Sequence, residues 1–271
     1  LSAADGTDDN DSNPTQAQYS AIGVTGVDTA AKESLLGDIV DISNNSDVDT
    51  VAEVQALADA VQSVMDAAAG AADKPTKAEL EALGITGVTT DNLAAIQQAI
   101  AATSDDGTGV DDLGELQTLA TNAAAAAATA LTSISAAAQA NDAASTSLAQ
   151  SVYEDAGVTG VVSASILADI NALLDTANID GAATDTTGEV QALVDGYIAI
   201  QTAADGTADN NASDPTQADY TAIGVTGVDD AEEEALLGDV IDAANGADVN
   251  TQGEVQALAD AVQSVMDAAA G

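Results

Sequence analysis

A five-residue motif, Gly-(Val/Ile)-Thr-Gly-Val, occurs four times in the chain and limits its possible folds more than any other feature. The copies lie 61, 73 and 67 residues apart, at 23–27, 84–88, 157–161 and 224–228. A second motif, Glu-(Val/Leu)-Gln, follows each copy, and its glutamate lies 30 to 32 residues after the first glycine, at Glu53, Glu115, Glu189 and Glu254. Periodicity on this scale indicates a tandem array of small units, each of which buries apolar surface against its neighbours.

The first helix of each repeat is predicted from its boundaries. All three prolines stand nine residues before a repeat glycine, and each is followed by threonine: Pro14, Pro75 and Pro215. Proline disfavours helix in the residue before it, and threonine is a good N-cap. We therefore predict a two-turn helix from Thr15 through Tyr19 and Ile22. Gly23 ends it in the left-handed conformation, with Val24 completing a Schellman motif.

Two further helices are predicted in each repeat. Asp28 is expected to cap the second helix, whose apolar residues share one face: Leu35, Leu36, Ile39 and Val40. A polar loop, 43–49, follows. The third helix begins with a capping box, Thr50-x-x-Glu53, and the box recurs as Asp112/Glu115, Thr186/Glu189 and Thr251/Glu254. We interpret the recurrent glutamate as a helix cap and not as a catalytic acid.

These elements predict an all-α fold, a tandem array of four small three-helix bundles that form an elongated rod. Residues 1–6 are assigned to the tail of a preceding repeat, and the bundles to 7–70, 71–140, 141–204 and 205–271. The third repeat has Leu148 at the proline position. Because no glycine or proline lies between Leu116 and Ala156, we expect a long helix that bridges the two middle bundles, interrupted near Asn141–Asp142.

Repeats one and four are near copies. Between 14–70 and 215–271, 42 of 57 positions are identical, and 53–70 recurs unchanged as 254–271. This gives a higher-order period of 201 residues, equal to three bundles. Together with a first residue, Leu1, that is not methionine, this period leads us to expect a piece of a longer protein.

The charge limits the possible partners. The chain has 46 acidic residues against three lysines, no arginine and no histidine, for a net charge of −43. Such a surface repels phosphate backbones, so a nucleic-acid partner is not expected. No apolar run was found that approaches the length of a membrane span, so membrane insertion is not expected either. The charge favours solubility, or a medium rich in salt or calcium that screens self-repulsion.

Catalytic chemistry is not expected. Without histidine or cysteine there is no Ser-His-Asp triad, thiol nucleophile or usual zinc site. We therefore predict no enzyme activity, no catalytic, cofactor-binding or metal-binding residues and no cofactor. Calcium is the one ligand left open, at two oxygen-rich loops that lack the glycine and terminal glutamate of an EF-hand. Their residues are Asp9, Asp11 and Asn13 in one loop, and Asp205, Asp209, Asn211 and Asp214 in the other.

The pattern Pro-Thr-x-Ala-x-Tyr, Gly-Val-Thr-Gly-Val, Glu-Val-Gln-Ala-Leu resembles the helical tandem repeats of giant surface adhesins of Gram-negative bacteria. The modules are similar in outline to small helical modules of Gram-positive surface proteins. The resemblance implies a secreted, extracellular, cell-attached fibre with a role in cell adhesion and biofilm, in which such modules are spacers. The glycine-rich calcium-binding nonapeptides of RTX proteins are absent, and no motif matches an albumin-contacting helix.

Three functions remain open. The chain is expected to be a stalk that holds a distal binding domain of unknown specificity away from the cell, with neighbouring repeats as its partners. Alternatively, it is a self-assembling subunit of a filament or surface layer, in which divalent cations would have to lie between chains. The third possibility is a protein-binding three-helix module, which would carry an exposed apolar patch on each unit.

Overall fold

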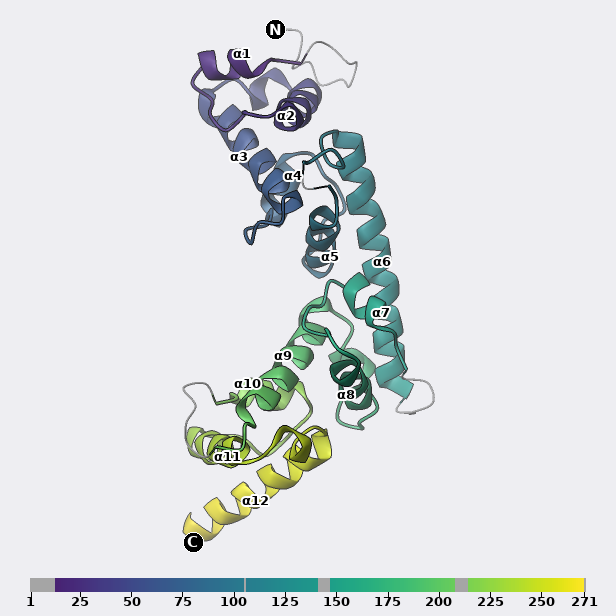
Figure 1. Cartoon of the computed structure of the whole chain (residues 1–271), viewed down its shortest axis with the longest axis vertical. Coiled ribbons are helices and arrows are strands. Elements are labelled where there is room, and N and C mark those ends of the chain that lie inside the picture. Colours follow the sequence, from purple (N-terminus) through teal and green to yellow (C-terminus); the bar gives the residue numbers. More distant parts are fainter. Residues whose placement is uncertain (1–12, 105, 141–146, 208–213, 271) are drawn as a thin grey trace. The chain divides into compact units, whose positions relative to one another are not determined.

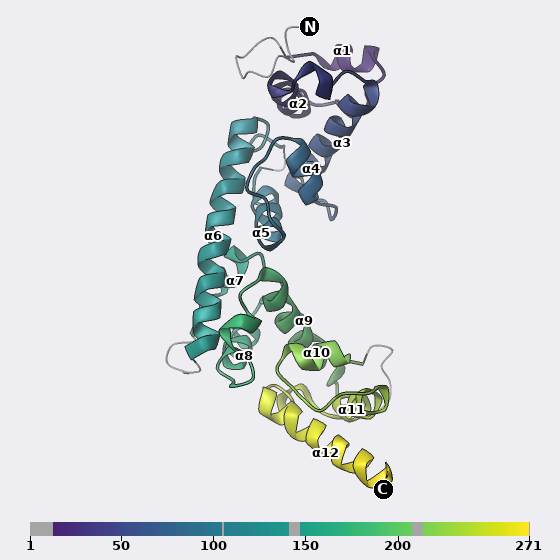
Figure 2. The same ribbon diagram turned by 180° about the vertical axis from the view of Figure 1, so that it is seen from behind.

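The computed structural model describes residues 13–104, 106–140, 147–207 and 214–270, and within these ranges it contains twelve α-helices and no strand (Figures 1 and 2). The predicted all-α class is therefore confirmed. The chain divides into two compact units, 1–127 and 128–271. Each unit has its own hydrophobic core.

Unit 1 contains two repeats. Its helices are α1 (Gln16–Ala21), α2 (Ala30–Ile42), η1 (Asn45–Asp47), α3 (Val51–Ala68), α4 (Lys77–Ala82), α5 (Thr90–Ala101) and the first half of α6 (Leu113–Ala140). Unit 2 contains the rest of α6, then α7 (Gln150–Asp155), α8 (Ala164–Leu174), η2 (Gly181–Ala183), α9 (Thr187–Ala203), α10 (Gln217–Ala222), α11 (Ala231–Ala243), η3 (Gly246–Asp248) and α12 (Gln252–Ala270). The order of short, medium and long helix thus recurs four times.

The glycine stop of the first helix has the predicted geometry. Gly23 has a φ of 94°. Its N–H donates to Ser20 O at 3.1 Å, and the N–H of Val24 donates to Tyr19 O at 3.0 Å, which together form a Schellman motif. The second of these bonds recurs in the other repeats, from Ile85 to Leu80, from Val158 to Tyr153 and from Val225 to Tyr220.

The predicted cap of the second helix is wrong by one residue in repeat one. Thr29, not Asp28, is the N-cap of α2, and its hydroxyl accepts the N–H of Lys32 at 3.3 Å. Asp28 instead pairs with the ammonium group of Lys32, with 2.6 Å between Oδ1 and Nζ. Helix α11 of repeat four has Glu233 in place of the lysine, yet its N-cap is also the corresponding residue, Asp230. The ion pair therefore does not move the cap, and in both repeats the N-cap is the residue whose extended backbone precedes the first turn.

Three of the four predicted capping boxes of the third helices are confirmed, and at the fourth, Asp112/Glu115, only the cap by Asp112 is present. Glu53 Oε2 accepts the N–H of Thr50 at 2.9 Å, and the N–H of Glu53 donates to Thr50 Oγ1 at 3.3 Å. The same reciprocal pair forms at Thr186/Glu189 and at Thr251/Glu254. At the start of α6, Asp112 Oδ1 accepts the N–H groups of Gly114 and Glu115. The recurrent glutamate thus acts on the helix terminus at these three boxes.

The third helix of a repeat packs against two repeats. Helix α3 contacts α2 of its own repeat and also α4 and α5 of the next one, which lie beside it in Figure 1. In the same way α9 contacts α8 and then α10 and α11. The core of unit 1 is therefore one continuous cluster of buried side chains, which contains both Leu36 of repeat one and Leu116 of repeat two. The interior of each unit is shared by two repeats, whereas the bundle boundaries after residues 70, 140 and 204 stay a prediction.

Helix α6 is the predicted long helix, 28 residues from Leu113 to Ala140. The expected interruption at Asn141–Asp142 lies outside the described residues. By length and composition alone α6 could cross a membrane, with a mean hydropathy of 1.2, so the expectation that no segment approaches such a span is wrong. This helix supplies the fully buried Leu116 to the core of unit 1 and the fully buried Ile134 to that of unit 2, and 33% of its most apolar 18-residue window is buried.

Candidate functional site

The two repeated motifs bind each other through a threonine and a glutamine. In repeat one, the N–H of Thr25 donates to Gln55 Oε1 at 2.8 Å, and Gln55 Nε2 donates to Thr25 O at 3.2 Å. We call this pair of hydrogen bonds the clasp. It recurs, with distances between 2.8 and 3.3 Å, at Thr86/Gln117, Thr159/Gln191 and Thr226/Gln256.

The clasp is built by two local features. Gln55 lies two residues after the capping glutamate, on the first turns of α3, so the capping box fixes the position from which its side chain extends. Thr25 lies in the turn between two left-handed glycines, where its N–H and C=O have no helix partner. A second hydrogen bond from Gln55 Nε2 to Asp59 Oδ1, at 2.7 Å, orients the amide. The clasp therefore fastens the turn between the first two helices to the third helix.

The sequence analysis identified both motifs but not their contact. The near-constant separation of 30 to 32 residues was the available signal, because a clasp between two fixed points tolerates little change in the chain between them. We interpret the clasp as structural, because its polar atoms form hydrogen bonds with each other.

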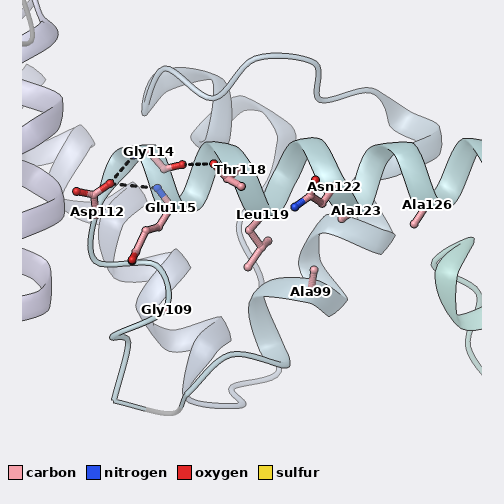
Figure 3. Close-up of a pocket in the computed structure, with 10 residues that line it drawn as sticks. All are labelled: Ala99, Gly109, Asp112, Gly114, Glu115, Thr118, Leu119, Asn122, Ala123 and Ala126. Carbon is pink, nitrogen blue, oxygen red and sulfur yellow. Dashed lines mark hydrogen bonds between the residues drawn. The ribbon is translucent and has the colours of Figure 1, made fainter.

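An open groove of 930 Å³ lies in unit 1 between α5 and α6. Figure 3 shows Ala99 of α5 facing Leu119 and Ala123 of α6. At one end of the groove, the Asp112 carboxylate caps α6, and the hydroxyl of Thr118 donates to Gly114 O at 2.7 Å. The remaining lining residues are Gly109, Gly114, Glu115, Asn122 and Ala126. Small apolar side chains with a hydrogen-bonded acidic end offer no nucleophile beside a base.

A smaller hollow of 330 Å³ lies in unit 2 between α8, α9 and η3. The hydroxyl of Tyr197 donates to Asp169 Oδ2 there, and Gln201 Nε2 donates to Val249 O at 3.0 Å. Burial, together with the hydrogen bond and negative charge of Asp169, raises the pKa of Tyr197 well above its usual range. The hydroxyl therefore stays protonated at neutral pH and acts as a hydrogen-bond donor, not as a base.

The predicted calcium loops are only partly covered by the structure. Asp9, Asp11, Asp209 and Asn211 lie outside the described residues. Of the others, Asn13 Nδ2 donates to Asp38 Oδ1 at 3.4 Å, and Asp205 Oδ1 accepts the N–H of Thr207 at 2.8 Å. Within the described part of the chain, no three acidic side chains come together in a way that could hold a metal ion. The absence of a cofactor stays a prediction.

Two glycines in the second helices make room for residues of these loops, and the sequence analysis did not predict this contact. A Cβ on Gly37 would lie 2.3 Å from Asn13 Cγ, and a Cβ on Gly238 would lie 2.9 Å from Asp214 Cβ. The glycines therefore let the segment before the first helix cross close to the second helix.

Lys32 is the one lysine that the structure buries, with 8% of its surface exposed. Its hydrogen bond and positive charge hold the pKa of Asp28 below its usual range. In repeat four a glutamate, Glu233, occupies the corresponding position and is equally buried. Its Oε2 accepts the N–H of Asp229 at 2.8 Å. The position therefore holds opposite charges in these two repeats, and in each the side chain bonds back to the turn before the helix.

No family model, curated protein or solved structure matches the chain. The resemblance to adhesin repeats, and the extracellular location that it implies, therefore stay predictions.

Proposed function

We propose that the chain is a structural spacer, a run of four three-helix bundles that forms an elongated stalk of a large secreted cell-surface adhesin or fibre. The stalk projects a distal binding domain, its partners are neighbouring repeats, and it has no catalytic, membrane-inserting or nucleic-acid-binding role.

The observation that carries this proposal is the sharing of a third helix between successive repeats, at α3 and at α9. In α3, Val54 and Val61 lie in the core of unit 1 together with Tyr19 and Leu36. Farther along the same helix, Ser63 Oγ donates to Glu79 Oε1 of the next repeat at 2.9 Å. A continuous helix that belongs to two repeats resists bending at their junction far better than a peptide linker does.

The recurrent clasp supports the same function. A stalk must keep its repeats folded under tension, and the clasp ties the turn in each repeat to its third helix at a separation of about 30 residues along the chain. The net charge of −43 adds mutual repulsion, which favours an extended chain of repeats over a collapsed one.

The protein-binding alternative has less support. Among the described residues, the large apolar side chains that are exposed are Ile22, Val51, Val162 and Val265. They stand at four different positions of the repeat, so they do not form the repeated patch that a binding module would carry.

Small-angle X-ray scattering of the full chain, with and without calcium, tests the spacer. A compact globule of this length would have a radius of gyration of about 18 Å. Four bundles end to end would extend on the order of 100 Å or more, which corresponds to a radius of gyration of about 30 Å. An elongated monomer under both conditions is expected. A value near that of a globule would refute the stalk, and side-by-side association on adding calcium would favour the surface-layer alternative.

A further inference from the structure

We propose that the small hollow of unit 2 binds an organic cation, an ammonium or guanidinium group on a short alkyl stem. The hollow lies between α8, α9 and η3, and the residues that recognise the cation are Asp169, Tyr197 and Gln201. This inference goes beyond the spacer function, because a spacer needs no ligand, and the site stands or falls on its own chemistry.

These three polar residues stand where the other repeats have apolar side chains. Counted from the N-cap of the second helix, the counterparts of Asp169 are Leu35, Ala95 and Leu236. Counted from the Glu-(Val/Leu)-Gln motif, those of Tyr197 are Val61, Ala123 and Val262. Those of Gln201 are Met65, Ala127 and Met266. Proteins depart from their own packing rules mainly at functional sites, so three such departures around one hollow, in one repeat of four, indicate a site.

Unit 1 shows the same place with apolar side chains. Leu35 and Val61 belong to its core and are 0% and 1% exposed. Met65 lies over a glycine in the loop of the next repeat, since a Cβ on Gly107 would lie 2.6 Å from Met65 Sδ. In unit 2, Gln201 lies over a glycine in the same way, with its Oε1 2.8 Å from a Cβ on Gly246. A second helix, a third helix and a loop of the next repeat meet in both units, so the polarity of the hollow follows from its side chains.

The hydrogen bonds in the hollow leave oxygen acceptors for a ligand. The Tyr197 hydroxyl donates to Asp169 Oδ2, and Gln201 Nε2 donates to Val249 O at 3.0 Å. Among the residues that the structure describes, no hydrogen bond is found to Asp169 Oδ1 or to Gln201 Oε1. A carboxylate oxygen and an amide oxygen accept but do not donate. A ligand that pairs with both must therefore supply N–H or O–H donors.

The charge of the hollow favours a cation among such donors. Asp169 is the one acidic residue that lines it, and no lysine does. Hydrogen bonds between a carboxylate and an ammonium or guanidinium group are about twice as strong as those between neutral groups. The net charge of −43 also raises the local concentration of cations around the chain. An anionic ligand would meet only repulsion here.

The size and the apolar part of the hollow fit a short alkyl stem. Ile166 and Ile198 line it beside the polar residues. Its volume of 330 Å³ is close to the lower limit of ligand pockets, which measure about 300–1,000 Å³. One side chain or one small amine fits such a volume, whereas a large ligand does not. The cation can therefore be a lysine or arginine side chain of a partner protein, or a free alkylamine.

NMR titration of the full chain tests this site at constant ionic strength, which sodium chloride maintains. The cationic probes are n-butylammonium, n-butylguanidinium and a blocked alanyl-lysyl-alanine peptide, and 1-butanol is the neutral control. We expect saturable shifts of the amide signals of Tyr197, Gln201 and Gly246 with cationic probes only. Leu35 and Val61 in unit 1 report unspecific accumulation of cations, and their shifts should not saturate. If no cationic probe gives saturable shifts at the hollow, or if butanol gives the same shifts, the proposal is wrong.

The same titration distinguishes the two sources of the cation. If the blocked peptide binds more tightly than n-butylammonium, its backbone adds contacts at the rim, and the ligand is a basic side chain of a partner protein. If n-butylammonium binds more tightly, the peptide backbone hinders entry, and the ligand is a free amine. Both outcomes support a cation site in the hollow.

Variants assign the binding to Asp169. Asp169→Asn keeps the shape of the side chain and removes its charge, so affinity should fall about tenfold to a hundredfold. The double variant Asp169→Leu, Tyr197→Val has the apolar pair of repeats one and four, and it should lose saturable binding while circular dichroism shows an intact fold.

Asp185→Asn is the matched control, because Asp185 is exposed in unit 2 and does not line the hollow. It removes the same charge and should bind the probes as the wild type does. If Asp169→Asn keeps its affinity, or if the control loses as much, the cations respond to the charge of the whole chain and the site is refuted.

Discussion

The side-chain amide of Gln55 forms two hydrogen bonds with the backbone of Thr25, one to its N–H and one to its C=O, across 30 residues of chain. The amide thereby supplies hydrogen-bond partners for backbone groups in a turn, where no helix supplies them. This clasp is present in all four repeats, and the first prediction tests its contribution to stability.

Replacing Gln55 by alanine should destabilise unit 1 by about 1 kcal/mol. The two hydrogen bonds of the clasp are lost, and their net contribution is small because the site is partly exposed. Urea unfolding measures the free energy, and the amide of Thr25 should also exchange faster with solvent. Gln62→Ala is the control. Gln62 likewise donates to an aspartate four residues later, Asp66, but that bond lies within α3. Equal losses in the two variants would mean that the clasp adds nothing to stability.

A pair of tyrosine substitutions should have opposite effects in unit 2. The hydroxyl of Tyr153 donates to Asn171 Oδ1 at 2.8 Å, so Tyr153→Phe should cost about 1 kcal/mol. The buried hydroxyl of Tyr220 has no hydrogen-bond partner among the residues that the structure describes. Tyr220→Phe should therefore leave stability unchanged or raise it by about 1 kcal/mol. Thermal unfolding compares them, and a larger loss for Tyr220→Phe would contradict this assignment.

The four tyrosines should resist ionisation in alkali. Burial raises the pKa of Tyr19, Tyr153, Tyr197 and Tyr220 above the usual value of 10.0, with nearby acidic groups adding to the effect at all except Tyr153. A raised folded-state pKa contributes stability that is fully present below pH 10 and is lost as the pH rises above it. Because the chain has no tryptophan, absorbance at 295 nm reports tyrosinate directly. Ionisation should coincide with loss of helical circular dichroism; tyrosinate that forms near pH 10 in the folded chain would refute this.

The capping box of α3 should make a contribution to the free energy of unfolding that is lost in acid. Hydrogen bonds from the Thr50 hydroxyl and N–H lower the pKa of Glu53 below its usual value of 4.5. Its contribution is therefore present above pH 4.5 and is lost as the pH falls through the lower, folded-state pKa. The stability difference between wild type and Glu53→Gln should be largest at neutral pH and disappear in acid. NMR titration of the Glu53 carboxylate in Thr50→Ala should give a pKa closer to the usual value, and an unchanged pKa would contradict this cause.

Two glycines of α9 should respond oppositely to alanine. A Cβ at Gly196 would lie 2.6 Å from the backbone oxygen of Asp219 in α10, so Gly196→Ala should cost about 1–3 kcal/mol by forcing the helices apart. Gly188, near the start of the same helix, has no atom within 4 Å of such a Cβ. Gly188→Ala should therefore be neutral, or stabilising by up to about 1 kcal/mol. Calorimetry ranks the variants, and equal stability would show that α9 and α10 can separate without cost.

Much of the local structure was predictable from the sequence because it depends on groups only a few residues apart. The stop at Gly23 needs hydrogen bonds to Tyr19 and Ser20, and the box at Thr50 needs only Glu53. The cap of α2 was misplaced by one residue because the turn before the helix is one residue longer than expected, as it is before Asp230 in repeat four. The clasp was missed because its partners are 30 residues apart, and no local rule relates them.

The sequence by itself determined the helices, most of their ends and their fourfold recurrence, because these depend on short-range hydrogen bonds and on the spacing of apolar residues within each repeat. Only the tertiary structure decided what those helices pack against. Val64 and Val265 lie within the same 18-residue sequence, yet one is fully buried and the other is mostly exposed. Burial depends on which other segment is there to exclude water, and that is a property of the assembled neighbours rather than of the helix itself.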